Sequence, residues 1–431
     1  MEETLTPTRS KMETYPVSYY KQYKSGCHIR TSSRNSLCYN TTYGTTLVEG
    51  STLVTNEIAL YAHFPFCQSR CHYCSFVSFA GREADIPAYV NALEEELTQR
   101  AKGEHLSSIF LGGGTPSLLS ADQLGRILAK IRTLFSVEKA AEISLEANPG
   151  TVDERYLAAA RQFGINRLSL GVQSLDDIIL VRLGRTHTAA QAHQAVRFAR
   201  NSGFTNLSLD LIYGIPGQSL TDWQDTLKEA VRLDPEHLSL YPLSLEDDVP
   251  LSRAIRSGEL PAVDLDCTAE QYEAAEDYLA SEGYRHYEIS NWARDGVECR
   301  HNMVYWRCTS YLGIGVASHS YIDGHRQANT HDLDAYLRMF QLGKLYRPEA
   351  DEEITPEIKL WEAIAMGLRL SQGIEFANIR DRFGVDLISR YGQEIDELLH
   401  LGLLETDGQG LRLTQRGRLL GNEVFWRFLP Q

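Results

Sequence analysis

Between residues 56 and 245 the sequence alternates between short apolar runs and amphipathic helical patterns. The runs typical of buried strands are 57–64, 107–111, 142–147, 167–172, 207–212 and 237–241. Helical patterns separate them, near 87–100, 121–135, 153–163, 189–202 and 220–233. Six strands joined by helices predict an α/β fold with a parallel sheet built by right-handed crossovers. In such sheets, ligands bind at the carboxyl ends of the strands.

Three closely spaced cysteines follow the first predicted strand. Cys67, Cys71 and Cys74 have the spacing C-x3-C-x2-C. Three thiolates can hold a [4Fe–4S] cluster and leave one iron open, whereas most clusters take four cysteines. The competing interpretations are a zinc site, which would need a fourth ligand, and ordinary structural thiols. His72 lies within the loop, but its short separation from the neighbouring cysteines makes a tetrahedral site awkward.

Other unusual residues also fall near the ends of predicted strands. A glycine-rich turn, GGGTP at 112–116, follows the second strand, and glycines there would let the backbone approach a ligand closely. Single polar residues stand near later strand ends: Glu146, Gln173, Arg185 and Asp210. Each alone could cap a helix or satisfy backbone groups. Because all of them lie near strand ends, we expect them to lie together on one rim of the sheet. There they predict a site for a cofactor with an amine, a carboxylate, a ribose and an adenine.

The rest of the chain has a different pattern. Residues 246–350 form a predicted connecting region with a helix at 269–282 and strands at 285–291 and 313–322. Residues 351–431 predict helices at 357–370, 375–383 and 389–401, a hairpin, and a helix at 416–428, which resembles a winged-helix module. Its charges of both signs are interleaved, which favours a packing or lid domain over a DNA-binding one.

Residues 1–55 are rich in Ser, Thr, Tyr and Asn, and predict a disordered extension. Alternatively, these residues are a transit peptide, or the start codon has been assigned too far upstream.

Composition excludes some classes of function. The net charge of −15 argues against a general binder of nucleic acid or anionic membranes. The sequence has no apolar run long enough to span a bilayer. Eight cysteines in 431 residues, three of them in one motif, suit a reducing cytosol. We therefore expect a cytoplasmic protein, with organellar targeting by residues 1–55 as the alternative.

These motifs together resemble the radical S-adenosylmethionine (SAM) family. The resemblance covers residues 56–430 and is to the branch that contains oxygen-independent coproporphyrinogen III oxidase (HemN) and the haem chaperones HemW. It implies a partial (β/α)6 TIM-like barrel over 56–245, completed by 246–350, and a HemN-type C-terminal domain over 351–431. It also implies that Cys67, Cys71 and Cys74 hold a [4Fe–4S] cluster whose open iron binds the amino and carboxylate groups of SAM.

Further roles follow from the resemblance alone. Tyr61 and Tyr73 would flank the cluster and SAM, and Glu146 would contact the ribose or the amino group. Gly113, Gly114 and Thr115 would hold the methionine portion. Gln173, Arg185 and Asp210 would complete a polar rim that serves a second SAM in the oxidase. No catalytic residue is assigned.

Two features favour the chaperones within this branch. The oxidase has a fourth cysteine two residues beyond the third, where this chain has Phe76. The segment HNMVYW at 301–306 matches the H-N-x-x-Y-W signature of HemW. His301 is the first candidate ligand for haem, with His319, His63 and Cys299 as rivals. Alternatively, His301 and Asn302 hydrogen-bond a loop while Tyr305 and Trp306 fill the core.

The resemblance implies a haem chaperone that binds a [4Fe–4S] cluster, SAM and haem. Its expected partners are haem, an unidentified acceptor haemoprotein, and an electron donor such as flavodoxin or ferredoxin if SAM is cleaved. We expect no nucleic acid and at most peripheral contact with a membrane. The alternative function is oxidative decarboxylation of coproporphyrinogen III, which Phe76 disfavours.

Overall fold

The computed structural model describes residues 57–430. The predicted disorder and the possible targeting role of residues 1–55 therefore lie outside the described residues. No helix among residues 57–430 combines the length and the apolar character needed to cross a membrane.

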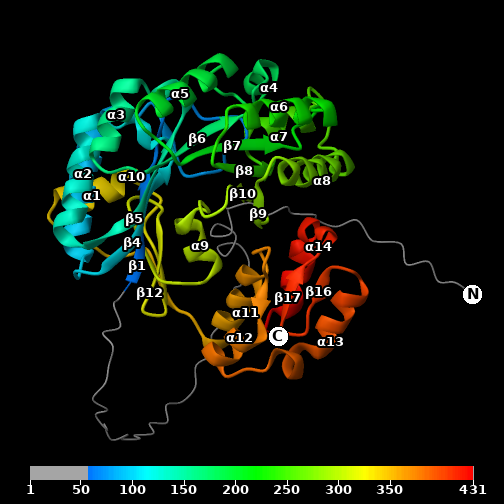
Figure 1. Ribbon diagram of the computed structural model, residues 1–431. Helices are drawn as coiled ribbons and strands as arrows, with labels where there is room; N and C mark the ends of the chain where they lie inside the picture. The colour runs from blue at the N-terminus through cyan, green and yellow to red at the C-terminus, as the bar shows by residue number, and fades with distance from the viewer. Residues whose placement is uncertain (1–56, 431) are drawn as a thin grey trace, which may run out of the picture.

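Six parallel strands form the centre of one large sheet, as the sequence predicts (Figure 1). They are β1 (Glu57–Phe64), β4 (His105–Gly113), β5 (Ser136–Ala147), β6 (Arg167–Gln173), β7 (Leu207–Tyr213) and β8 (His237–Pro242). Each pairs in parallel with the next in this order. Leucines in the middle of these strands, such as Leu60, Leu111 and Leu209, are fully buried. Parallel strands covered on both faces are typically apolar in this way.

Shorter strands extend both edges of this sheet. β10 (Asn291–Ala293) and β9 (Arg285–Glu288) add to β8 in antiparallel pairs. On the other edge β11 (Tyr311–Ile314) pairs in parallel with β1, and three antiparallel strands follow: β12 (His319–Ile322), β13 (His325–Ala328) and β14 (Ala350–Glu353). The order runs from β14 to β9 without the two edges pairing. This open order is consistent with the expected partial barrel.

Helices cover the outside of the parallel strands. They are α1 (Ile86–Arg100), α2 (Ala121–Leu134), α3 (Glu154–Gln162), α5 (Ala189–Asn201), α6 (Leu220–Arg232) and α8 (Leu265–Ser281). Capping boxes at Ser120, Thr188 and Ser219 fix where α2, α5 and α6 begin, because each side chain accepts a backbone N–H that the helix leaves free. The sequence missed α4 (Asp177–Arg182), a short helix capped by Asp176.

Two predicted strands and one predicted helix are each divided into shorter elements in the structure. Residues 285–291 form β9, a turn and part of β10, while 313–322 contains the end of β11, a turn and β12. The predicted helix at 416–428 is two short helices, α14 (Gln415–Leu419) and α15 (Gly421–Phe425), with a final 3-10 turn. Leu420 separates them because its backbone, at φ −114° and ψ 29°, is not helical.

The C-terminal part has a hydrophobic core of its own. It contains α11 (Pro356–Gly367), α12 (Phe376–Phe383), α13 (Leu387–His400) and a small sheet of β15 (Ile374–Glu375), β17 (Gly410–Leu413) and β16 (Leu404–Thr406). Trp361, Leu398 and Phe428 are buried among these elements. Helices followed by a small sheet agree with the predicted winged-helix pattern, although the domain boundaries themselves stay predictions.

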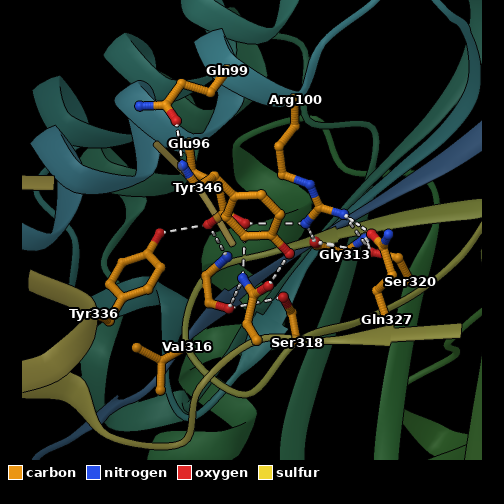
Figure 2. Close-up of polar contacts among 12 residues, drawn as sticks. Glu96, Gln99, Arg100, Gly313, Val316, Ser318, Ser320, Gln327, Tyr336 and Tyr346 are labelled. Carbon is orange, nitrogen blue, oxygen red and sulfur yellow. Dashed lines mark hydrogen bonds and ion pairs between the residues drawn. The ribbon is translucent and has the colours of Figure 1, made fainter. Parts of the chain in front are cut away.

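A buried polar network joins α1 to the turn after β11 (Figure 2). The Glu96 carboxylate, fully buried, accepts hydrogen bonds from Gly315 N (2.9 Å), Tyr336 Oη (2.6 Å) and Asn329 Nδ2 (2.8 Å). Arg100 pairs with Glu96 at 3.1 Å and donates to Gly313 O at 2.6 Å. Because buried charges must be paired to be tolerated, this network fixes the β11 turn against α1.

Candidate cluster and cofactor site

The three motif cysteines lie on a short loop at the carboxyl end of β1. β2 (Phe66–Cys67) and β3 (Phe79–Ala80) close the base of this loop, and Cys74 N donates to Cys71 O at 3.2 Å. All three thiols are half-buried. His72 points away toward α4: its backbone N–H donates to Leu183 O, and its Nδ1 lies 3.0 Å from Arg182 O. The loop therefore carries all three cysteines, whereas His72 between them contacts the backbone at the end of α4.

Arg185 places a positive charge beside the cysteines. Its Nη1 lies 3.3 Å from Cys71 Sγ, and its Nη2 donates to Asn148 Oδ1 (2.5 Å) and Gly171 O (2.7 Å). Burial raises the pKa of Cys67, with the Cys71 charge adding to the rise, and Arg185 acts to lower it. A guanidinium near thiols favours the thiolate, which is the form that binds metal.

The residues of the loop fit an iron–sulfur cluster. Burial raises the pKa of Cys74, and the charges of both Cys71 and Cys67 raise it further. No three His, Cys, Asp or Glu side chains within 57–430 converge closely enough to hold a single metal ion. In a cubane each thiolate would bind a different iron, so its sulfurs need not converge on one point. The loop is therefore compatible with a [4Fe–4S] cluster held by three cysteines.

The glycine-rich turn after β4 closes on the cysteine loop. A Cβ on Gly114 would lie 2.7 Å from Phe66 O and 3.1 Å from Cys67 Sγ, so only glycine fits there. Gly113 has φ +115°, and a Cβ on it would lie 2.6 Å from the His63 ring. Thr115 Oγ1 lies 3.6 Å from Cys67 Sγ. The predicted SAM-binding turn and the predicted cluster loop are therefore neighbours.

Two half-buried carboxyl groups, Glu146 and Asp210, stand on the strands beyond this turn. Gly113 N donates to Glu146 Oε2 at 2.9 Å. Burial, followed by the charge of Asp210, raises the pKa of Glu146 to about 8. Asp210 accepts hydrogen bonds from Ser169 Oγ (2.9 Å) and Ser208 Oγ (3.3 Å), and burial raises its pKa as well. A cationic ligand here would restore the ionised carboxylates.

Gln173 and the two tyrosines also border this region. Gln173, at the end of β6, has a left-handed backbone with φ 65°. A Cβ on Gly171 would lie 3.0 Å from Gln173 Nε2 and 3.5 Å from Arg185 Nη2, so both side chains border this glycine. Burial raises the pKa of Tyr73, whose interacting groups are Arg185, Cys71 and Cys74. Tyr61 lies deeper: its hydroxyl is 2.9 Å from His63 Nδ1 and its ring stacks on Phe110. The structure therefore brings Tyr73 to the cysteines and places Tyr61 nearer the barrel interior.

His301 stands apart from the cysteine loop. It lies on α9 (Arg300–Trp306), which Figure 1 shows between the sheet and the C-terminal helices. Its Nδ1 is 2.9 Å from Ser108 Oγ and its Nε2 is 3.0 Å from Tyr305 Oη. The ring is 1% exposed, and burial lowers its pKa to about 3. Ligation of haem iron by His301 would require one of these hydrogen bonds to break.

Two of the other candidate haem ligands, His63 and Cys299, also contact other groups of the protein. The His63 nitrogens contact Tyr61 Oη and Val77 O (3.1 Å). The Cys299 thiol is 3.5 Å from Glu142 Oε1, and burial raises its pKa to about 12, which disfavours the thiolate. His319 is half-buried on β12. His301 is buried and hydrogen-bonded, as the alternative interpretation of the segment expects, whereas Tyr305 and Trp306 are only half-buried and do not fill the core.

Sequence reasoning missed one residue that organises the site. Asn148 joins Arg185 to Thr115, since its Oδ1 accepts from the guanidinium and its Nδ2 donates to Thr115 Oγ1 at 3.0 Å. The signal was visible as an amide side chain at a strand end, directly before Pro149 and Gly150. The partner of Arg185, in contrast, could not be identified without the fold.

Comparison with known proteins agrees with this architecture. Residues 61–230 match the model of the Radical SAM superfamily, and residues 354–420 match that of the HemN C-terminal domain. The chain is 36% identical over 369 residues to the protein named heme chaperone HemW of Lactococcus lactis, which covers 86% of this chain and 96% of that protein. The Bacillus subtilis protein of the same name is 35% identical over 376 residues, 86% of this chain and 99% of that protein.

A solved structure shows the same fold. The Escherichia coli coproporphyrinogen III oxidase (HemN), described as a radical SAM enzyme, superposes with a TM-score of 0.76 at 26% identity. The match covers 86% of this chain and 90% of that chain. From its motifs, its fold and these relatives, the chain belongs to the radical SAM family, in the branch of HemN and HemW.

Proposed function

We propose that this protein is a haem chaperone of the radical SAM type, which binds haem and delivers it to acceptor haemoproteins. The observation that carries the proposal is the identity of 35–36% to proteins named heme chaperone HemW over nearly their whole length. Phe76 supports the same choice, because it stands where the related oxidase has a fourth cysteine. Its side chain is 46% exposed beside the cysteine loop.

The cofactors of this family are a [4Fe–4S] cluster and SAM. We assign the cluster to Cys67, Cys71 and Cys74, and the SAM site to Tyr73, Gly113, Gly114, Thr115 and Glu146, with Tyr61 behind them. Gln173, Arg185 and Asp210 form the remaining polar rim. When bound, the cluster would supply an electron and an open coordination position. The chain itself contributes the Arg185 charge beside the thiols and the half-buried carboxyl groups of Glu146 and Asp210 for a cationic cofactor.

Partners and location follow from this function. The cargo is haem and the acceptor is an apo-haemoprotein, with contact at a membrane surface at most peripheral. An electron donor such as flavodoxin or ferredoxin would be needed if SAM is cleaved. A cytoplasmic location suits free thiols that must remain reduced to bind a cluster.

The second candidate is oxygen-independent coproporphyrinogen III oxidase. The superposition on HemN over 86% of the chain favours it, because the same scaffold surrounds the cysteine loop. The missing fourth cysteine disfavours it. The chain therefore keeps the scaffold of the oxidase without one of its distinguishing residues.

Two assays on anaerobically reconstituted protein separate these functions. A chaperone takes up haem and transfers it to an apo-haemoprotein, whether or not coproporphyrinogen III is present. An oxidase converts coproporphyrinogen III while consuming SAM. We expect transfer without conversion, and conversion without stable haem uptake would refute the chaperone function. Cys71→Ser is the control, because it should abolish any SAM-dependent conversion.

A further inference from the structure

A large cavity opens at the end of the barrel opposite to the cysteine loop. Its volume is about 680 Å³, and its lining includes the first residues of β1 and β4, namely Glu57, Ile58 and Ser107. Residues 370–372, which follow α11, and the helix α9 form other walls. Pockets that bury a ligand typically measure about 300–1,000 Å³ and favour domain interfaces. The cavity is therefore large enough for a bulky ligand.

The helix α9 presents a distinct face to this cavity. Arg300, Met303, Val304 and Arg307 all line it, and the spacing of 3, 4 and 7 residues places them on one side of a helix. His301 and Tyr305 lie on another side, in contact with each other and with the barrel interior. The histidine and tyrosine of the HNxxYW segment thus anchor the helix, whereas the two residues between Asn302 and Tyr305 face the cavity.

The charge of the cavity favours an anionic ligand. Three arginines line it, Arg285, Arg300 and Arg307, against two glutamates, Glu57 and Glu298. This local excess of positive charge occurs in a chain whose net charge is −15. Arg285 pairs with the exposed Asp295, and an exposed pair of this kind is weak. A ligand carboxylate could compete for this guanidinium at little cost.

The cavity also offers apolar surface and a soft metal ligand. Ile58, Val304 and Leu370 line it together with the Tyr287 ring, whose hydroxyl is held 2.9 Å from His237 Nε2. His286 is the imidazole of the lining, but its nitrogens contact Glu276 Oε1 (3.0 Å) and Ile289 O (3.2 Å). Besides this imidazole, Tyr287 and Met303 are of the kinds of side chain that ligate haem iron in other proteins. Because the Tyr287 hydroxyl already contacts His237, Met303 is the stronger candidate.

We propose that this cavity is where the protein holds haem, with Met303 as an iron ligand and the arginines binding the propionates. The apolar walls would cover the macrocycle. This inference rests on the proposed chaperone function, and it places the cargo at the opposite end of the barrel from the cluster and SAM.

Haem titration of the full chain, followed by absorbance, tests the site. Met303→Leu keeps the size and apolar character of the side chain but removes the sulfur, and Met339→Leu on α10 (Leu333–Gln341) is its matched control. Arg307→Glu reverses a charge in the cavity, and Arg347→Glu is the control at an exposed position away from it. Far-UV circular dichroism of each variant checks that it folds.

We expect Met303→Leu to remove the thioether-to-iron(III) charge-transfer band. Arg307→Glu should weaken haem affinity by about tenfold, the loss expected for one charge-assisted hydrogen bond. Both controls should match the wild type. If the wild type binds haem while both cavity variants keep its affinity and spectrum, the site is elsewhere and the chaperone function stands. If the wild type binds no haem, the proposed function itself fails, and this inference with it.

Discussion

At the scale of single residues, we expect the half-buried carboxyl of Glu146 to make stability depend on pH. Burial and Asp210 raise its pKa to about 8 from 4.5. The folded protein then holds a proton that the unfolded chain has lost, so this contribution is complete below pH 4.5 and disappears as pH rises through about 8. Glu146→Gln should flatten this part of the pH profile.

Urea denaturation of the cluster-free protein at about pH 5 and about pH 8 measures this effect. The free energy of unfolding should fall more steeply toward high pH in the wild type than in Glu146→Gln. Glu95→Gln, at an exposed position on α1, should behave like the wild type. Equal slopes in the wild type and Glu146→Gln would show that Glu146 ionises normally in the folded protein.

His301 carries a second prediction at this scale. His301→Ala removes a buried ring and leaves the hydroxyls of Ser108 and Tyr305 without their partner. We expect a loss of about 2–4 kcal/mol in the free energy of unfolding. Haem uptake should weaken because α9 loses its anchor, while the iron content of the reconstituted protein should not change. An unchanged stability would contradict the anchoring role.

At the scale of elements, the buried hydrogen bonds and ion pair of Glu96 hold α1 against the turn after β11. Glu96→Ala would leave Arg100 buried with its carboxylate partner gone (Figure 2). Breaking a buried ion pair in this way typically costs about 3–5 kcal/mol. Chemical denaturation should show this loss, and Glu95→Ala on the same helix should change stability by no more than about 0.5 kcal/mol. A similar small effect of Glu96→Ala would mean that water replaces the carboxylate.

The same elements show what the sequence could predict. The central strands were visible because each is a short segment rich in leucine, isoleucine or valine, and most of them end near a distinctive motif. The boundary between β9 and β10 was not visible, since it depends on Glu288, a fully buried carboxylate whose partner Arg369 follows α11 far along the chain. Similarly, the cysteine spacing predicted the loop. The hydrogen bond of His301 was not predictable, because its partner Ser108 lies 193 residues away in the sequence.

At the scale of the whole molecule, the proposed cluster and haem sites lie at opposite ends of the barrel. β1 has 8 residues, so about 26 Å of strand separates its first residues from the cysteine loop. Cys71→Ser should therefore abolish the cluster, measured as bound iron, without changing haem affinity in a titration. Loss of haem binding together with the cluster would show that the two sites are one.

The most direct measurement for the whole molecule is electron paramagnetic resonance of the reduced, anaerobically reconstituted protein with and without SAM. Three cysteine ligands leave one iron open, so SAM should change the spectrum of a [4Fe–4S] cluster in the wild type. The protein with Cys71→Ser should give no such signal. A wild-type spectrum that SAM leaves unchanged, or a protein that assembles no cluster, would contradict the assignment of Cys67, Cys71 and Cys74.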